Sequence, residues 1–159
     1  MAKPRKRKIG AGDVATNRQA AYRYELLDKL EAGMVLRGTE VKALRDGGAT
    51  MKDAYATIDD GEVWLHNLHI PPYQPASREN HAPERDRKLL LHRREIDRIT
   101  GRIAEKGWTL VPTRIYFSDG RAKIELALAR GKDRHDKRES IKAREMKRDM
   151  DRQLRDVGR

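Results

Sequence analysis

The sequence WTLVPTRIYFSDGRAKIELALA, residues 108–129, predicts two long strands joined by a tight turn. The turn carries Asp119-Gly120, and Asp-Gly between alternating apolar residues is a strong signal for a β-hairpin. Apolar side chains occupy every second position of the second strand: Ile124, Leu126 and Leu128. This alternation is typical of a strand with one buried and one solvated face. Pro112 has no N–H for the ladder, so we expect it at a sheet edge or a bulge.

A second hairpin is expected upstream, where Ala54–Ile58 and Glu62–Ile70 flank the turn sequence Asp59-Asp60-Gly61. Tyr22–Leu36 fits a helix through its leucines and a buried strand through Met34-Val35-Leu36, and we expect it to be mostly strand.

Two helices are expected among these strands. His92–Lys106 has an apolar face and ends before Gly107. A shorter helix over Thr39–Arg45 is expected to begin at Thr39. No repeated strand–helix–strand pattern is visible, so the fold class is mainly β with peripheral helices, in a small closed or partly open antiparallel barrel.

The charge gathers at the two ends of the chain. The formal net charge is +11, and residues 1–10 carry five Lys/Arg and no acidic residue. Residues 131–159 carry eleven Lys/Arg against seven Asp/Glu, so the middle of the chain is close to neutral. We expect a flexible basic arm over residues 1–12, a barrel over 13–130 and a basic tail over 131–159.

The tail is poor in large apolar side chains and cannot offset the entropy of ordering itself, so we expect it to be largely disordered on its own. Its propensities are nevertheless helical, because residues 139–157 contain no Pro or Gly. Three apolar residues also recur every four positions: Met146, Met150 and Leu154. A latent basic helix suggests a segment that orders on a large polyanion.

The composition favours a nucleic-acid partner. The pI of about 10.1 with clustered Lys/Arg is typical of nucleic-acid binding, and the alternative is a solvated, salt-bridged surface. The absence of cysteine excludes disulfides and cysteine-ligated metal. No apolar run approaches the ~20 residues of a membrane span, and no signal-peptide pattern is visible. We expect a cytoplasmic protein with no membrane partner.

Enzyme chemistry finds little support. No GxxxxGK[ST] or GxGxxG motif occurs. His66 and His69 are three apart on an expected strand, which points them to opposite faces. A surface or RNA-facing imidazole is favoured over a metal ligand for these two and for His81, His92 and His135. We expect no catalytic residue, no metal and no cofactor.

A cationic cluster precedes an aliphatic run, where Arg85, Arg87 and Lys88 lead into Leu89-Leu90-Leu91. Alternation along a strand would bring Arg85 and Arg87 out beside a packed strand, where guanidinium groups can contact phosphates or stack on bases. The alternative is the charged outer face of the following helix, which explains this cluster less well. Tyr22 is open to either an isolated stacking contact or plain packing.

Four strings occur together in a specific order and spacing. They are EAGMVLRGTEVKALR (31–45), NHAPERDRKLLLHRREI (80–96), TLVPTRIYF (109–117) and LARGKDRHDKRESIK (128–142). From Asn17 to Arg148 the chain resembles the SmpB family, the bacterial partners of transfer-messenger RNA (tmRNA). Tyr22 stands where that family commonly has His, and Asp133 replaces a usual Lys.

The resemblance implies an OB-like antiparallel β-barrel that grips the tRNA-like domain of tmRNA and enters a stalled ribosome. It further implies a non-catalytic role, in which the tail occupies the empty mRNA channel as a helix; we expect a monomer. The RNA-facing positions of the family match Glu31, Leu90 and His92, beside Arg87 and Lys88, and we add Arg85 and Tyr22. The tail junction of the family matches Gly131, Lys132, His135, Asp136, Lys137 and Arg138.

The alternative function is a structural protein that binds ribosomal RNA generally through its basic extensions. An enzyme is a distant third. Strong preference for the tRNA-like domain over bulk ribosomal RNA would separate the first two functions.

Overall fold

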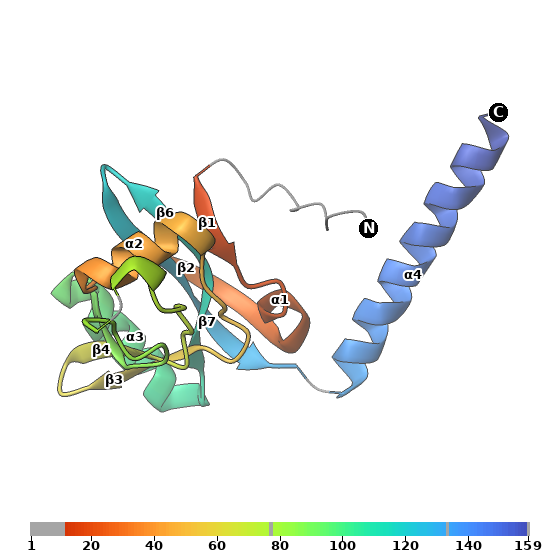
Figure 1. Ribbon diagram of the computed structural model, residues 1–159. Helices are drawn as coiled ribbons and strands as arrows, with labels where there is room; N and C mark the ends of the chain where they lie inside the picture. Colours follow the sequence, from red (N-terminus) through yellow and green to blue (C-terminus); the bar gives the residue numbers. More distant parts are fainter. Residues whose placement is uncertain (1–11, 77, 133, 159) are drawn as a thin grey trace.

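The computed structural model describes residues 12–76, 78–132 and 134–158 (Figure 1). The expected arm over residues 1–12 therefore lies outside the described residues except at Gly12. Over the described part the elements are β1 (Asp13–Thr16), α1 (Ala20–Arg23), β2 (Tyr24–Met34), α2 (Gly38–Gly47), β3 (Tyr55–Asp59), β4 (Glu62–His66), η1 (Gln74–Ala76), β5 (Arg87–Leu90), α3 (Arg93–Lys106), β6 (Thr109–Ser118), β7 (Arg121–Gly131) and α4 (Arg134–Val157).

The strands form one antiparallel sheet that closes on itself. Its order over the described residues is β1-β6-β3-β4-β5-β2-β7, and β6 also pairs with β7. The pairing of β6 with β7 closes the sheet into a ring. Strand β1 is not part of this ring and pairs with β6 alone among the described strands. The predicted mainly β barrel with peripheral helices is confirmed, and Figure 1 shows α2 and α3 lying against its outside.

Both predicted hairpins are present, and both turn through positive φ. Asp60 and Gly61 join β3 to β4 with φ of 49° and 73°, and Asp119 and Gly120 join β6 to β7 with φ of 51° and 74°. Two consecutive residues with positive φ define the turn type whose twist matches that of paired strands. The Asp-Gly pairs thus set the register of both hairpins.

Pro112 lies at a bulge, as predicted. The β6–β7 register shifts between Pro112 and Arg114, so one extra residue is accommodated on β6. The side chain of Asn17 donates to the carbonyl of Pro112 at 2.9 Å and to that of Met51 at 3.3 Å. Asn17 therefore ties the chain after β1 to the bulge.

The helices begin and end close to the expected residues. His92 is the N-cap of α3, and Gly107 follows the helix in the left-handed conformation with φ of 64°. The predicted start of α2 at Thr39 is wrong, because the helix begins at Gly38 with Arg37 as its N-cap. Glu40 accounts for the difference: its carboxylate accepts a hydrogen bond from the Arg37 N–H at 3.0 Å and fixes the first turn one residue earlier.

The core lies inside the ring of strands. Its members are aliphatic side chains from most of the strands, joined by Ile96 and Ile99 of α3. Leu65, Leu110, Ile115, Ile124 and Leu126 are fully buried. Burial of such side chains is the main favourable free energy of folding for a barrel of this size.

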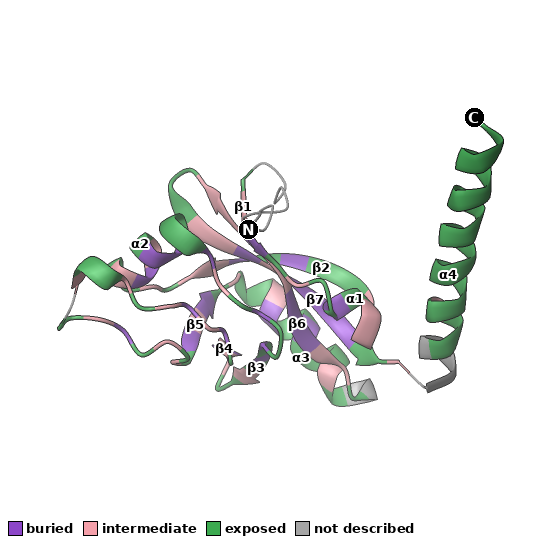
Figure 2. Ribbon diagram, turned by 45° about the vertical axis from the view of Figure 1, so that its right-hand side comes forward, coloured by how far each residue is buried: buried purple, intermediate pink, exposed green. Residues whose placement is uncertain are grey.

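The tail contradicts the expectation of disorder. Residues 134–157 form one helix, α4, of 24 residues. Figure 2 shows the rest of this helix beyond its grey first turn as mostly exposed and standing apart from the barrel. The helix has no internal Pro or Gly, and opposite charges sit four residues apart at Lys147 and Asp151 and at Asp151 and Arg155. Local propensity over that length outweighs the lack of a buried face.

Among the described residues, no helix has both the length and the apolar character needed to cross a membrane.

Candidate nucleic-acid interface

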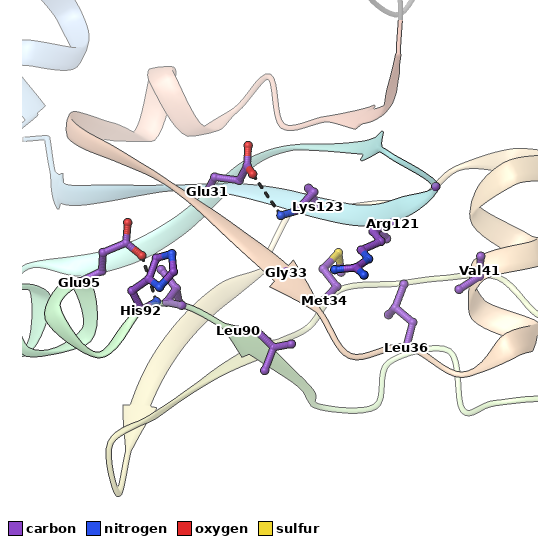
Figure 3. A pocket seen from close by; sticks show the side chains of 13 residues that line it. Glu31, Gly33, Met34, Leu36, Val41, Leu90, His92, Glu95, Arg121 and Lys123 are labelled. Atoms are coloured by element: carbon purple, nitrogen blue, oxygen red, sulfur yellow. Dashed lines mark hydrogen bonds and ion pairs between the residues drawn. The ribbon is translucent and has the colours of Figure 1, made fainter.

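A groove of about 680 Å³ opens on the outside of the barrel (Figure 3). Its walls come from three places: the end of β2 with the connection to α2, the end of β5 with the start of α3, and the β6–β7 turn. Three predicted RNA-facing residues line it together: Glu31, Leu90 and His92. These positions are up to 61 residues apart in the sequence, and the β2–β5 pairing brings them onto one face.

The floor of the groove is apolar around Leu90. This side chain is 54% exposed and lies directly opposite Gly33 in the β2–β5 pair. A Cβ at Gly33 would sit 3.4 Å from the Cβ of Leu90, an ordinary van der Waals contact, so the two residues are close neighbours on the outer face. Met34, Leu36 and Val41 continue the apolar lining. An apolar floor between polar walls suits the flat face of a base or a ribose.

Glu31 places a fixed carboxylate at one wall. The Tyr116 hydroxyl donates to its Oε2, and Lys123 Nζ lies 3.2 Å from its Oε1. These two hydrogen bonds hold the pKa of Glu31 below the ordinary value of 4.5. Burial raises the pKa of Tyr116 to about 12, and its bond to Glu31 acts in the same direction. At neutral pH the pair is therefore a carboxylate and a neutral phenol.

A carboxylate in this position selects what the groove can hold. It repels phosphate but accepts hydrogen bonds from base amino groups and ribose hydroxyls. Arg121 and Lys123 line the same groove and supply positive charge for the backbone. Apolar floor, acceptor and cations together fit a nucleotide better than a purely cationic patch would.

His92 closes the groove at the start of α3. It is the N-cap residue, and its backbone N–H donates to Glu95 Oε2 at 3.2 Å. Figure 3 shows this bond and the His92 ring on the groove side of the helix. The cap fixes the backbone from which the ring projects, and an imidazole plane can stack on an unpaired base.

The prediction that Arg87 faces RNA is wrong. Its side chain is fully buried, and its Nε donates to Oε2 of the equally buried Glu40. The remaining donors reach backbone carbonyls: Leu68 at 2.7 Å, Arg85 at 3.1 Å and Pro83 at 3.0 Å. Arg87 alternates with Leu89 on the core side of β5, so the face that buries the leucine also buries the arginine.

Arg85 belongs to the same ion cluster. Its Nε and Nη2 both donate to Oε1 of Glu40, the former at 2.8 Å. Burial raises the pKa of Glu40, but the hydrogen bonds from the Arg37 N–H, Arg87 and Arg85 outweigh it and hold the pKa below 4.5. The predicted Arg85 contact with RNA stays a prediction, although most of this guanidinium is committed to joining the 85–87 segment to α2.

Lys88 lies on the outer face of β5, and its Nζ is 2.8 Å from Oε1 of Glu62. Its contact with RNA stays a prediction. His81 was expected at the surface and is instead buried. Its Nε2 donates to the Ile70 carbonyl at 3.0 Å, so its Nδ1 accepts from the Thr39 hydroxyl at 2.9 Å. This imidazole anchors the loop before β5 to α2.

Tyr22 and the tail junction form a second cluster, away from the groove. The backbone N–H of Lys132 donates to the Arg23 carbonyl at 3.2 Å, and Lys132 Nζ donates to the Ala21 carbonyl at 2.9 Å. The Arg144 guanidinium of α4 lies 5.9 Å from the centre of the Tyr22 ring. The root of α4 is therefore held against α1.

The remaining junction residues are placed only in part. Gly131 ends β7 opposite Tyr24, and Arg138 is exposed on α4. Asp133 and the side chains of His135, Asp136 and Lys137 lie outside the described part of the structure. Their predicted contacts with the ribosome stay predictions.

Sequence reasoning missed the other groove residues, among them Gly33, Met34, Arg121 and Lys123. Lys123 precedes the buried Ile124, so alternation places it on the wet face of β7, but its neighbours there come from β2. Within the described residues, no three His, Cys, Asp or Glu side chains converge as a metal site would require.

Comparison with known proteins decides the family. The family described as SmpB protein matches residues 14–156, nearly the whole described chain. The chain belongs to the SmpB family. As an SmpB family member it is similar to the "SsrA-binding protein" of Mycobacterium sp. (strain KMS), 58% identical over 141 residues, which are 89% of this chain and 84% of that protein.

Two further similarities support the same family. The "SsrA-binding protein" of Mycobacterium ulcerans is 52% identical over 159 residues, 100% of this chain and 93% of that protein. A chain of the solved structure described as "tmRNA-SmpB: a journey to the center of the bacterial ribosome" superposes with a TM-score of 0.65 at 47% identity. That likeness covers 80% of this chain and 93% of the other.

Proposed function

We propose that this SmpB family member binds tmRNA and acts with it in trans-translation on stalled ribosomes. The observation that carries the proposal is the groove that unites Glu31, Leu90 and His92 in a chain of this family. The names of its relatives, SsrA-binding proteins, and a solved likeness described with tmRNA and the ribosome support the same partner.

The barrel, residues 13–130, grips the tRNA-like domain through the groove. The Glu31 carboxylate accepts a hydrogen bond from a base or a ribose, and Leu90 packs against the same nucleotide. Arg121 and Lys123 neutralise nearby phosphates. The tail, residues 131–159, enters the empty mRNA channel, and its preformed basic helix, Arg134–Val157, is roughly 36 Å long at about 1.5 Å per residue. The protein is a cytoplasmic monomer and an adaptor without catalysis of its own.

A matched pair of leucine variants tests the groove. Leu90→Ala removes the apolar floor, whereas Leu27→Ala removes a leucine of β2 that is 40% exposed and does not line the groove. We expect Leu90→Ala to weaken binding of the tRNA-like domain about tenfold and Leu27→Ala to leave it unchanged, measured by fluorescence anisotropy at physiological salt. Equal effects of the two variants would refute the groove as the RNA contact.

The alternative function, general binding to ribosomal RNA, is tested by competition. Unlabelled ribosomal RNA fragments should displace the tRNA-like domain only at a large molar excess. Displacement at equal concentration would favour a structural ribosomal role. Both arms must be run at the same salt concentration, because counterion release makes affinity for RNA steeply salt-dependent.

A further inference from the structure

A threonine of β3, a histidine of β4 and the aspartate just before β5 form a hydrogen-bonded chain on the outside of the barrel. The Thr57 hydroxyl lies 2.7 Å from Nε2 of His66, and Nδ1 of His66 lies 2.9 Å from Oδ1 of Asp86. Thr57 and Asp86 are exposed, and the His66 side chain is 22% exposed. None of the three residues lines the groove.

The chain of bonds fixes the tautomer of the imidazole. A carboxylate only accepts, so Nδ1 of His66 carries the proton and donates it to Asp86. Nε2 then presents its lone pair to Thr57, whose hydroxyl donates. The ring is also held by the Tyr55 ring, whose centre is 5.1 Å away at an angle of 30°. This is the order of groups that makes a hydroxyl nucleophilic: hydroxyl, neutral imidazole, carboxylate.

The barrel contains a natural comparison for this arrangement. The Thr39 hydroxyl also bonds a neutral imidazole, that of His81, but a backbone carbonyl stands where Asp86 stands for His66. A carbonyl orients the ring without offsetting the positive charge that it gains on accepting a proton. Thr57 therefore has a base that is bonded to a carboxylate, whereas the base beside Thr39 is bonded to a carbonyl.

We propose that Thr57 is an acyl-acceptor site, which His66 deprotonates and Asp86 positions, for activated acyl donors such as active esters and thioesters. In the reaction the Thr57 oxygen forms a bond to the acyl carbon, and the bond from that carbon to the leaving group breaks. The Thr57 proton passes to Nε2 of His66 and then to the leaving group. The product is an O-acyl threonine, formed once per molecule, and the step is independent of the proposed RNA function.

The test treats the full chain with p-nitrophenyl acetate and locates the acetyl group by peptide mass spectrometry. The tryptic peptide 53–78 contains Thr57 as its one threonine and no lysine, so fragment ions separate Thr57 from Tyr55, Tyr73 and Ser77. We expect acetylation of Thr57 at least about tenfold faster than that of Thr39 or of the exposed Thr50, since a positioned base contributes about 10²–10⁴ in protected sites.

Variants assign the roles. His66→Phe keeps a ring beside Tyr55 but removes the base, and Asp86→Asn removes the carboxylate; each should slow Thr57 acetylation at least about fivefold while Thr39 acetylation and the thermal midpoint stay unchanged. Thr57→Ser should retain the reaction. Acetylation of Thr57 at the rate of Thr50, or an equal rate in His66→Phe, would overturn the proposal and leave the three residues a cross-strand hydrogen-bond chain.

Discussion

The barrel and α4 are ordered by different means within one chain. The barrel is held by contacts between residues distant in sequence: Glu40 binds Arg87 across 47 positions, and Asn17 reaches Pro112 across 95. Nearly all the described side chains of helix α4 are exposed, and the contacts of the tail with the body include those of Lys132 and Arg144 with α1. The difference teaches that long-range packing specifies the barrel, whereas local propensity specifies the tail.

The largest expected effect concerns the buried ion cluster of the barrel. Glu40→Ala leaves the guanidinium of Arg87 buried without its carboxylate, and we expect a loss of about 3–5 kcal/mol in the free energy of unfolding. Glu62→Ala removes the carboxylate of the half-exposed pair with Lys88 and should cost less than about 1 kcal/mol. Urea denaturation measures both, and similar losses would show that burial does not distinguish the two pairs.

Two leucines compare the body with the tail directly. Leu126 is fully buried and Leu154 is 72% exposed on α4. Leu126→Ala should lower the free energy of unfolding by about 3 kcal/mol, through lost burial and a cavity. Leu154→Ala should change it by less than about 0.5 kcal/mol. A large loss from Leu154→Ala would mean that α4 packs on the barrel in solution.

The pH dependence of stability tests the role of Glu40 in the barrel. Its pKa in the folded protein is held below 4.5, so its contribution to stability is fully present above that pH and is lost as the pH falls through the lowered pKa. Glu40→Gln is less stable at pH 7 but has no such contribution to lose. The stabilities of the two proteins should therefore converge between pH 5 and the acid transition, and parallel pH curves would contradict the assignment.

The sequence predicted what local chemistry determines. The Asp-Gly turns, the bulge at Pro112 and the end of α3 at Gly107 follow from residues adjacent in the chain. Arg87 was misassigned because its partner Glu40 is on another element, and a single sequence does not give the pairing; its alternation with Leu89 was the available clue. The burial of His81 was not predicted for the same reason, because its partners Thr39 and Ile70 lie on other segments. The groove residues Glu31, Leu90 and His92 came from family resemblance, whereas Lys123 and Arg121 needed the register of β2 with β7.

The prediction for α4 was wrong for the opposite reason. Disorder was inferred from the lack of a buried apolar face, whereas helix propensity determines the conformation of this segment. Two exposed alanines test this explanation: Ala143 in α4 and Ala104 in α3. Glycine at either position costs about 1 kcal/mol of helix stability. Ala143→Gly should reduce the far-UV helical signal without moving the thermal midpoint of the barrel, and Ala104→Gly should lower that midpoint by several degrees. A midpoint unchanged in both variants would mean that α3 is also independent of the barrel.

The division of labour between barrel and tail is tested most directly by measuring RNA affinity and peptide tagging in one variant. Lys132, Lys137 and Arg138 are replaced together by Gln in the full chain. The affinity for the tRNA-like domain should stay within about twofold, because the groove is untouched, while tagging on stalled ribosomes is lost. Loss of RNA affinity in step with tagging would contradict the account, because the tail would then belong to the RNA-binding surface.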